Sequence, residues 1–580
     1  MNDFCIPGYD YSTREMREET VAGLFARAVS ARSGVERGWQ RCNDYYNFSH
    51  DVGRELRESG QTEELNWLPA AMPDAWIIVE SQVDPNVPEP QFHGRDNDMD
   101  SQKARQREYA VRYIAENNRL TDMNTRNERR LLKYGDAFWK AYWDSEMRCG
   151  IQEGDIRIRD IPVDAIYPDP AVTDGSLQDG QYVDYVYRIH KVAFLQRFRR
   201  DLEALGLEAE DILNLESRRH GVFDLETALD RDDDTVEVLE HWFRQPAELT
   251  LEGEVIPEGA VGCCILAGGH ELRYIPNYWK RTARECSLFP FVHYWRVQDE
   301  NRFWNKSELF PVLELIDAAD RKLAMGILGD AYMSNDIILV EEGALADGEV
   351  LTNEPGTILR CKPNRSSQIR RLGGVQSLAN AAVGLEWYKE QIERASRCYE
   401  ISRGKEAVRT STASGLAMLR TDAENQENIK RSDRNRGFER LYELLDALAL
   451  EFFDDDRMLW LGADERSGRK ATAFRFNSLE LTEHMGELTD MNGRVVREGY
   501  DYYPRVDVTI TAGDSVMQSK QATLETLQTL SAANITPENW KLYAAQLELL
   551  NIPEKQEIIE EWRERFALNV PAAETEETII

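Results

Sequence analysis

The stretch "KSELFPVLELIDAADRKLAMGILGDAYMSN" (residues 306–335) predicts a single long helix, around which the rest of the chain is arranged. Its apolar side chains recur at helical spacings of three, four and seven residues, at Leu309, Leu313, Ile316, Leu323 and Ile327. Ser307 is placed to cap this helix, and Pro311 is tolerated because it lies in about the first turn. At a rise of about 1.5 Å per residue, the helix is a rod roughly 40 Å long.

Two further helices follow this one. A strand-and-turn insert at 336–375 leads to a second long helix at 376–400, and a third is predicted at about 414–455. Two rods with a β-rich insert at their far end would protrude from any compact core, and their apolar faces need partners. Neighbouring copies of the chain in a ring would supply those partners.

Mixed α and β sequence precedes this block. Apolar periodicity over 100–133 predicts a helix that Gly135 ends. The segment "AFWKAYWD" (137–144) alternates as a half-buried strand does. The pattern "VGCCILAGGHELRYI" (261–275) predicts a hairpin that turns at AGG. The fold class expected from these patterns is α+β, in several domains.

Composition narrows the classes of function. The formal net charge is −34 and the isoelectric point is near 4.8, which argues against a protein that binds DNA over its whole surface. Eight scattered cysteines without close pairing indicate reduced thiols. No apolar run approaches the roughly 20 residues that span a bilayer, so no membrane partner is expected.

One segment departs from the acidic average. Residues 394–440 contain eleven basic and seven acidic side chains, a local net charge of +4. A local positive charge of this kind could contact a polyanion, such as a nucleic acid, that passes one place on the protein. An exposed helix whose charges pair with neighbours one turn away explains it equally well, and the charges do not choose between the two.

A search for catalytic patterns gives nothing with the required spacing. "GADERSGRKAT" (462–472) lacks the lysine and hydroxyl spacing of a phosphate-binding loop. "HELRY" (270–274) lacks the second histidine of a zinc-protease helix and lies in the predicted hairpin. Cys263 and Cys264 are adjacent in a strand, so they point to opposite faces. We therefore expect no enzyme activity, no metal and no cofactor.

The order of several stretches resembles that of the portal proteins of tailed bacteriophages. The likeness covers about 100–555, and its main carriers besides the block 306–400 are "LLKYGDAFWKAYWD" (131–144), "TASGLAMLRTDAENQENIK" (412–430) and "YYPRVDVTITAGDSVMQSKQATLETLQTL" (502–530). Each stretch is a loose pattern, and their succession along the chain carries the resemblance.

The resemblance implies a division of the chain into the parts of a portal subunit. The wing would comprise 1–305 and 414–515, and the stem would comprise the helices 306–335 and 376–400. The clip would be 336–375, the tunnel loop 401–413 and a short helical crown 516–567, before a disordered tail at 568–580. Such subunits assemble as a ring, usually of twelve copies.

The same resemblance implies a function. The ring would occupy one capsid vertex of the virion, after assembly in the host cytoplasm, and its channel would pass double-stranded DNA during packaging and ejection without reading its sequence. Expected partners are the large terminase subunit, a head-completion or adaptor protein, and the major capsid and scaffold proteins. The alternative is an oligomeric virion scaffold or adaptor that never contacts DNA.

Two sets of candidate residues follow from this mapping. The tunnel loop would present its basic and hydroxyl side chains to DNA phosphates in the channel: Arg403, Lys405, Arg409, Ser411 and Thr412. The clip would offer charged side chains to terminase and adaptor: Glu341, Glu342, Asp347, Glu349, Arg370 and Arg371.

Overall fold

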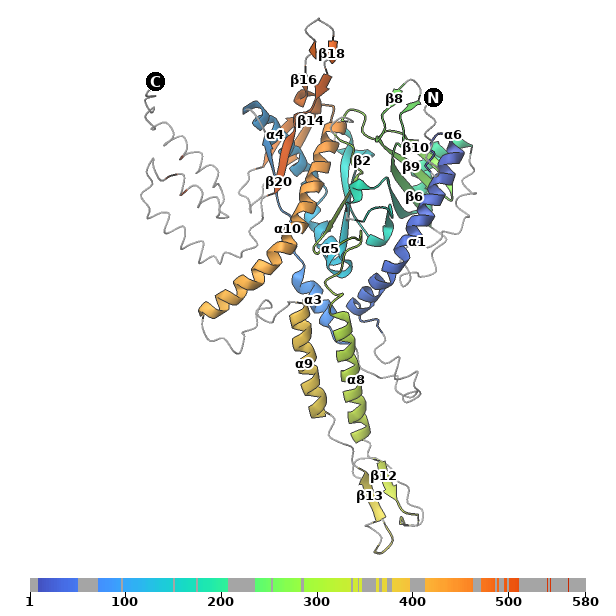
Figure 1. The fold of residues 1–580 in the computed structure, drawn as a ribbon, viewed down its shortest axis with the longest axis vertical. Helices are drawn as coiled ribbons and strands as arrows, with labels where there is room; N and C mark the ends of the chain where they lie inside the picture. The colour runs from blue at the N-terminus through green and yellow to red at the C-terminus, as the bar shows by residue number, and fades with distance from the viewer. Residues whose placement is uncertain are drawn as a thin grey trace.

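Two antiparallel sheets lie side by side in the body of the protein, and a pair of helices projects from it (Figure 1). The structure is a computed structural model. It describes residues 9–50, 71–94, 98–149, 152–173, 176–206, 235–251, 254–282, 286–334, 337–342, 344–346, 361–364, 368–372, 378–396, 413–462, 471–485, 488–489, 495–497, 500–510, 540, 543 and 562.

The larger sheet has five strands in the order β10-β9-β6-β5-β4. Its strands are β4 (Ile166–Pro168), β5 (Tyr182–His190), β6 (Thr235–Arg244), β9 (Val261–Ala267) and β10 (His270–Ile275). The β9–β10 hairpin is confirmed, and Gly268 and Gly269 at its turn have φ of 59° and 85°, which non-glycine residues rarely adopt. Cys263 and Cys264 pack into different hydrophobic clusters on the two faces of the sheet, as the alternation predicts.

The smaller sheet has the order β11-β2-β3 and lies against the longest helix. Its strands are β2 (Asp136–Cys149), β3 (Gln152–Ile161) and β11 (Phe291–Trp295). Short paired strands complete the described set: β1 (Pro90–Gly94), β7 (Leu249–Leu251), β8 (Glu254–Ile256), β12 (Ile337–Val340), β13 (Ile369–Leu372), β14 (Arg457–Leu461), β15 (Thr472–Phe476), β16 (Glu483–Met485), β17 (Leu488–Thr489), β18 (Val495–Arg497), β19 (Tyr500–Tyr502) and β20 (Val506–Ile510). The fold is thus mixed α and β, as expected.

Helices flank the sheets and form the projection. They are α1 (Arg14–Tyr46), α3 (Asp74–Gln82), α4 (Asp98–Asn117), α5 (Leu120–Tyr134), α6 (Lys191–Leu205), α8 (Leu313–Ser334), α9 (Leu378–Ser396) and α10 (Ala413–Phe452). No helix of the described residues combines the length and apolar character needed to cross a bilayer. Helix α10 matches the third predicted helix within a few residues.

A break separates α4 from α5. One helix was predicted over 100–133, but Arg119 has a left-handed backbone with φ of 53°. The Asn118 side chain donates hydrogen bonds to the carbonyls of Ile114 (2.8 Å) and Ile156 (2.9 Å), which ties the break to β3. Asn is a weak helix former whose short amide favours helix ends and turns, and the contact with β3 fixes it in this conformation. Gly135 ends α5 with φ of 91°, as predicted.

Helix α8 begins at Leu313, seven residues after the predicted start. Pro311 lacks an N–H group, and it disfavours a helical backbone at Phe310, the residue before it. Residues 308–312 therefore form turns, and the Ser307 hydroxyl accepts a hydrogen bond from the Phe310 N–H (3.0 Å). Ser307 caps this lead-in turn and not the helix itself.

The main hydrophobic core lies between the three-stranded sheet and the second half of α10. Trp139 of β2, Phe291 of β11 and Phe438 of α10 are each fully buried there. Gly437 permits this close approach, because a Cβ atom at that position would lie 2.3 Å from the Cβ atom of Tyr294 in β11. Each large apolar side chain buried in this way contributes about 1.5–3 kcal/mol.

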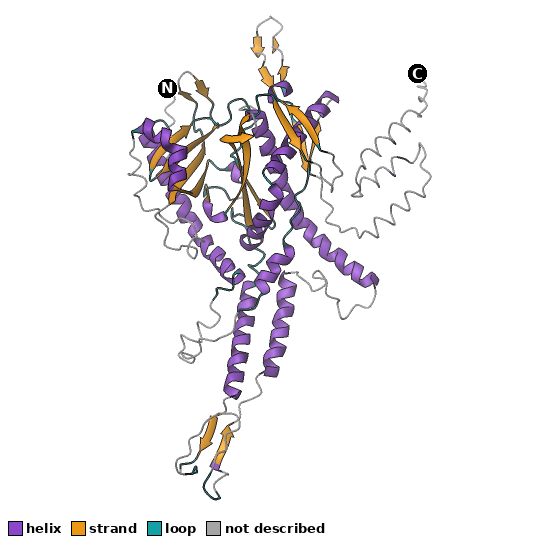
Figure 2. Ribbon diagram, turned by 180° about the vertical axis from the view of Figure 1, so that it is seen from behind, coloured by secondary structure: helices purple, strands orange, loops and turns teal. Residues whose placement is uncertain are grey.

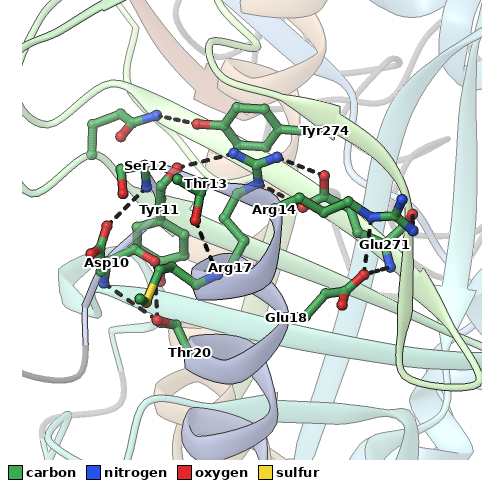
Figure 3. Close-up of polar contacts among 12 residues, drawn as sticks. Asp10, Tyr11, Ser12, Thr13, Arg14, Arg17, Glu18, Thr20, Glu271 and Tyr274 are labelled. Atoms are coloured by element: carbon green, nitrogen blue, oxygen red, sulfur yellow. Dashed lines mark hydrogen bonds and ion pairs between the residues drawn. The ribbon is translucent and has the colours of Figure 1, made fainter. Parts of the chain in front are cut away.

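The N-terminal segment is held against the larger sheet by polar contacts (Figure 3). The Arg17 guanidinium donates to both carboxylate oxygens of Glu271, at 2.6 and 2.8 Å, and lies 3.9 Å from the ring centroid of Tyr274. The Thr13 hydroxyl accepts from the Met16 N–H at 3.3 Å and caps α1. These contacts fix the start of α1 beside β10.

Candidate functional site

The long apolar helix pattern in the sequence predicted a pair of projecting helices with a β-rich insert. In the structure these are α8 and α9, with two strands at their far end. Figures 1 and 2 show α8 and α9 side by side, leaving the body together, with β12 and β13 beyond their ends. Strands β12 and β13 pair antiparallel, with Ile337 opposite Leu372 and Val340 opposite Ile369. The chain thus runs outward along α8 and back along α9.

The body end of this pair is embedded in a hydrophobic cluster. Leu309, Val312 and Ile316 are fully buried, and Ile392 of α9 is 2% exposed. They pack with residues of α1, α3 and α5, among them Tyr45, Ile78 and Leu132. The apolar stripe of the first part of α8 therefore faces the body, as its periodicity predicts.

A buried acid interrupts this apolar stripe. Asp320 of α8 is 1% exposed, and its carboxylate lies 2.9 Å from Nε2 of His50 and accepts from the N–H of Met72 at 2.9 Å. His50 in turn stacks on Tyr45, with ring centroids 4.0 Å apart. We did not identify Asp320 as a structural residue from the sequence. Its place four residues after Ile316, on the apolar face of the helix, was a signal that this acid is buried and paired.

Farther out, apolar side chains of both helices face solvent in the single chain. Met325 of α8 is 54% exposed, and Val383 and Trp387 of α9 are 68% and 54% exposed. Gly384 lets the helices approach, since a Cβ atom there would lie 3.1 Å from Cε of Lys322. The helices thus pack on each other and still leave apolar surface uncovered.

Two ion-pair groups tie α10 to the body and to the lead-in of α8. The Lys430 ammonium lies 2.7 Å from the Glu308 carboxylate, and Arg296 lies 3.9 Å from it. One turn along α10, the Arg434 guanidinium lies 2.6 Å from Glu128 of α5 and donates to the Asn86 carbonyl at 2.6 Å. Burial raises the pKa of Glu128, and the charge of Arg434 opposes that rise.

These pairs change the interpretation of the basic segment 394–440. Lys430 and Arg434 are buried and serve the internal structure. Arg394 and Arg436 pair with acids on their own helices, Glu390 at 2.7 Å and Asp433 at 3.2 Å. The interpretation as an exposed helix with pairs about one turn away therefore fits Arg394 and Arg436. Lys430 and Arg434 fit neither interpretation, because they are buried and pair with distant acids.

The five predicted tunnel-loop residues lie outside the described residues: Arg403, Lys405, Arg409, Ser411 and Thr412. The described chain stops at Ser396, the end of α9, and resumes at Ala413, the start of α10. Figure 1 shows the N-terminal turns of α10 extending away from the sheets, with a bend where the helix enters the body.

The six predicted clip residues are only partly placed. Glu341 and Glu342 follow β12 and are exposed, and the Glu341 N–H donates to the Gln368 carbonyl at 3.2 Å. Arg370 and Arg371 lie in β13, opposite Leu339 and Ile338. Asp347 and Glu349 lie outside the described residues. The structure therefore brings four of the six to one paired-strand unit at the far end of α8 and α9.

Within the described part of the chain, no group of three or more His, Cys, Asp or Glu side chains is arranged to hold a metal ion. His241 contacts Asp184 at 2.6 Å and Tyr11 at 2.9 Å, but all three residues are buried in the packing of α1 on the larger sheet. This triplet stabilises the core, and burial raises the pKa of Asp184.

Comparison with known proteins gives one family. The family model described as "Phage P22-like portal protein" matches residues 78–578, which is most of the chain. No curated protein matches the chain.

Proposed function

The chain belongs to the family of phage P22-like portal proteins, and from this premise we propose that it forms a ring, of twelve copies, at one capsid vertex. The ring channel passes double-stranded DNA during packaging and ejection. The family implies a structural protein of the virion with phage assembly partners. In this proposal, assembly takes place in the host cytoplasm, and the ring also contacts the major capsid and scaffold proteins.

The observation that carries the proposal is the projecting α8–α9 pair. Its outer part exposes Met325 of α8, and Val383 and Trp387, which are four residues apart and share one face of α9. Exposed apolar side chains of this size favour association with a partner. A second copy of this chain is the occupant that fits, because the same surface is repeated on every subunit of a ring. The pair is then the stem of the portal.

Charge supports a channel that does not hold DNA tightly. The net charge of −34 repels phosphates, whereas the segment 401–412 adds three cations and only one acid, Glu406. In the ring, Arg403, Lys405 and Arg409 contact the phosphates of passing DNA, without sequence preference. Ser411 and Thr412 add hydroxyl groups that donate to the same phosphates.

The unit of β12 and β13 is the proposed clip. It lies at the end of the α8–α9 pair that is remote from the body (Figure 2), where another protein can reach it. The exposed Glu341 and Glu342, together with Arg370 and Arg371 in β13 and the acids Asp347 and Glu349, supply the charges for docking. We assign the large terminase subunit and later a tail adaptor to this surface.

Ring assembly is the experiment that tests the proposal. The double variant Val383→Asp/Trp387→Asp places two carboxylates on the surface that the neighbouring copy covers. We expect the fraction of chains in rings, measured by native mass spectrometry and negative-stain images, to fall by at least about tenfold, because an unpaired charge is costly to bury.

The matched control is Lys389→Ser, an exposed polar change on the same helix, which should assemble as the wild type does. The thermal midpoint of the double variant should stay near that of the wild-type subunit, since Val383 and Trp387 are exposed within one chain. If the double variant formed as many rings as the wild type, the α8–α9 surface would not be the contact between neighbouring copies.

The tunnel-loop assignment makes a separate prediction. The triple variant Arg403→Ala/Lys405→Ala/Arg409→Ala should still form rings, but DNA retained in filled particles should fall by about tenfold, because phosphate contacts are lost in every subunit. Quantitative PCR of nuclease-protected DNA measures this. Unchanged packaging and retention would instead favour a scaffold or adaptor that does not contact DNA.

A further inference from the structure

A small cavity lies between the two sheets, beside α6 and away from the α8–α9 pair. Its volume is about 110 Å³, and it is bounded by residues of β2, β3, β5, β6, β9, β10 and α6. Its charged and tyrosine lining residues are Lys140, Tyr142, Arg159, Tyr185, Tyr187, Arg197, Glu240, Arg273 and Tyr278. Four cations and one acid therefore line a cavity in a strongly acidic protein.

The single acid of the cavity is already engaged. Both Glu240 and Lys140 are buried, with the Lys140 ammonium 2.5 Å from the Glu240 carboxylate. The indole Nε1 of Trp242 donates to the same carboxylate oxygen at 3.1 Å. Burial lowers the pKa of Lys140, and the Glu240 carboxylate opposes that change. Glu240 thus pairs with Lys140, and its single negative charge also acts on Arg197.

The arginines differ in their partners. Arg273 lies 2.6 Å from the carboxylate of Asp201, so its charge is balanced. Within the described part of the chain, neither Arg197 nor Arg159 has a carboxylate within ion-pair distance. Arg159 is exposed at the edge of the cavity, and Arg197 is only partly exposed. Two guanidinium groups therefore face this space with donors to spare.

A buried hydroxyl points to the same conclusion. The Tyr187 hydroxyl oxygen is buried without a hydrogen-bond partner among the described residues, although Tyr187 lines the cavity. An unsatisfied buried polar group costs about 1–3 kcal/mol, so such groups are rare without a ligand or water. A tyrosine hydroxyl is protonated at neutral pH and can donate, and burial raises the pKa of Tyr187 further.

We propose that this cavity is a binding site for a phosphate-class oxyanion, held by the guanidinium of Arg197, the hydroxyl of Tyr187 and, at the edge, the guanidinium of Arg159. Charge-assisted hydrogen bonds from arginine to phosphate oxygens are among the strongest in proteins. The volume of about 110 Å³ is small beside the roughly 300–1,000 Å³ of pockets for drug-sized ligands, so it fits a small anion. A whole nucleotide is too large, so the anion is either free phosphate or one phosphate of a nucleic-acid backbone.

Equilibrium dialysis of the full chain against radiolabelled inorganic phosphate tests this site. We expect saturable binding of one phosphate per chain, and an affinity at least about tenfold weaker in Arg197→Met and in Tyr187→Phe, because each change removes a donor to a charged ligand. Arg199→Met is the matched control, because Arg199 is on the same helix, 78% exposed and paired with Glu203, and it should bind as the wild type does.

A short DNA duplex added as competitor distinguishes the two sources of the anion. Displacement of labelled phosphate from the wild type assigns a backbone phosphate to the site, and retention of the label assigns free phosphate. Tyr187→Phe removes only one oxygen, so it decides the question even if Arg197→Met does not fold. Absence of saturable binding, or equal affinity in wild type, Arg197→Met and Tyr187→Phe, would overturn the proposal.

Discussion

Replacing Arg434 with alanine is expected to lower the free energy of unfolding by about 3–5 kcal/mol, the usual cost of removing one partner from a buried ion pair. The Arg434 side chain is 5% exposed and that of Glu128 is not exposed at all, with 2.6 Å between the guanidinium and the carboxylate. The variant leaves the Glu128 carboxylate in the interior without its main partner. Urea denaturation monitored by tryptophan fluorescence measures the loss.

The pH dependence of this loss follows from the pKa of Glu128, which burial raises from about 4.5. Without Arg434 the rise is larger, because its charge is the main opposing effect. A carboxyl group with a raised pKa in the folded state keeps a proton that the unfolded state releases. The stability of Arg434→Ala should therefore fall as the pH rises from about 4.5 to the folded-state pKa.

The control for Arg434→Ala is Arg436→Ala, two residues along the same helix. Arg436 is 66% exposed and pairs with Asp433 at 3.2 Å, so its loss should change stability by less than about 1 kcal/mol. The double variant Glu128→Leu/Arg434→Met should recover most of the stability, since it removes both charges and keeps apolar volume. Equal losses in Arg434→Ala and Arg436→Ala would contradict a buried pair.

This ion pair also shows the limit of sequence-based prediction. Glu128 and Arg434 are 306 positions apart, and Glu308 and Lys430 are 122 apart. A count of charges from 394 to 440 finds the cations but not their partners, because no local spacing links groups so distant. The local excess of positive charge therefore remained open to two interpretations until the fold placed the acids.

The helices that could be predicted from the sequence are those whose apolar residues recur at helical spacing. The sequence predicted α8, α9 and α10 from their apolar periodicity, whereas the start of α8 depends on backbone sterics at Pro311. The turn at Arg119 has a weak local signal in Asn117 and Asn118, which favour helix ends and turns, and a contact with β3 fixes Asn118. The candidate DNA-contacting residues at 401–412 lie outside the described residues, so their role remains a proposal.

Replacing Gly437 with alanine is expected to destabilise the protein by about 3 kcal/mol, at the upper end of the usual cost of overpacking a core. The added Cβ atom would lie 2.3 Å from Cβ and 2.7 Å from Cγ of Tyr294, which is 1% exposed. A rotamer change cannot move the Tyr294 Cβ atom, so α10 and β11 must separate. This clash outweighs the roughly 1 kcal/mol by which alanine favours a helix over glycine.

Gly34→Ala in α1 isolates the effect of packing from that of helix propensity. Gly34 is also inside a helix, but a Cβ atom there would have no neighbour within 4 Å. Gly34→Ala should therefore stabilise the protein by about 0.5–1 kcal/mol, while Gly437→Ala shifts the thermal midpoint in the opposite direction. Because only the contact with Tyr294 distinguishes the two sites, midpoints that rise together would mean that α10 does not pack against β11 at Gly437.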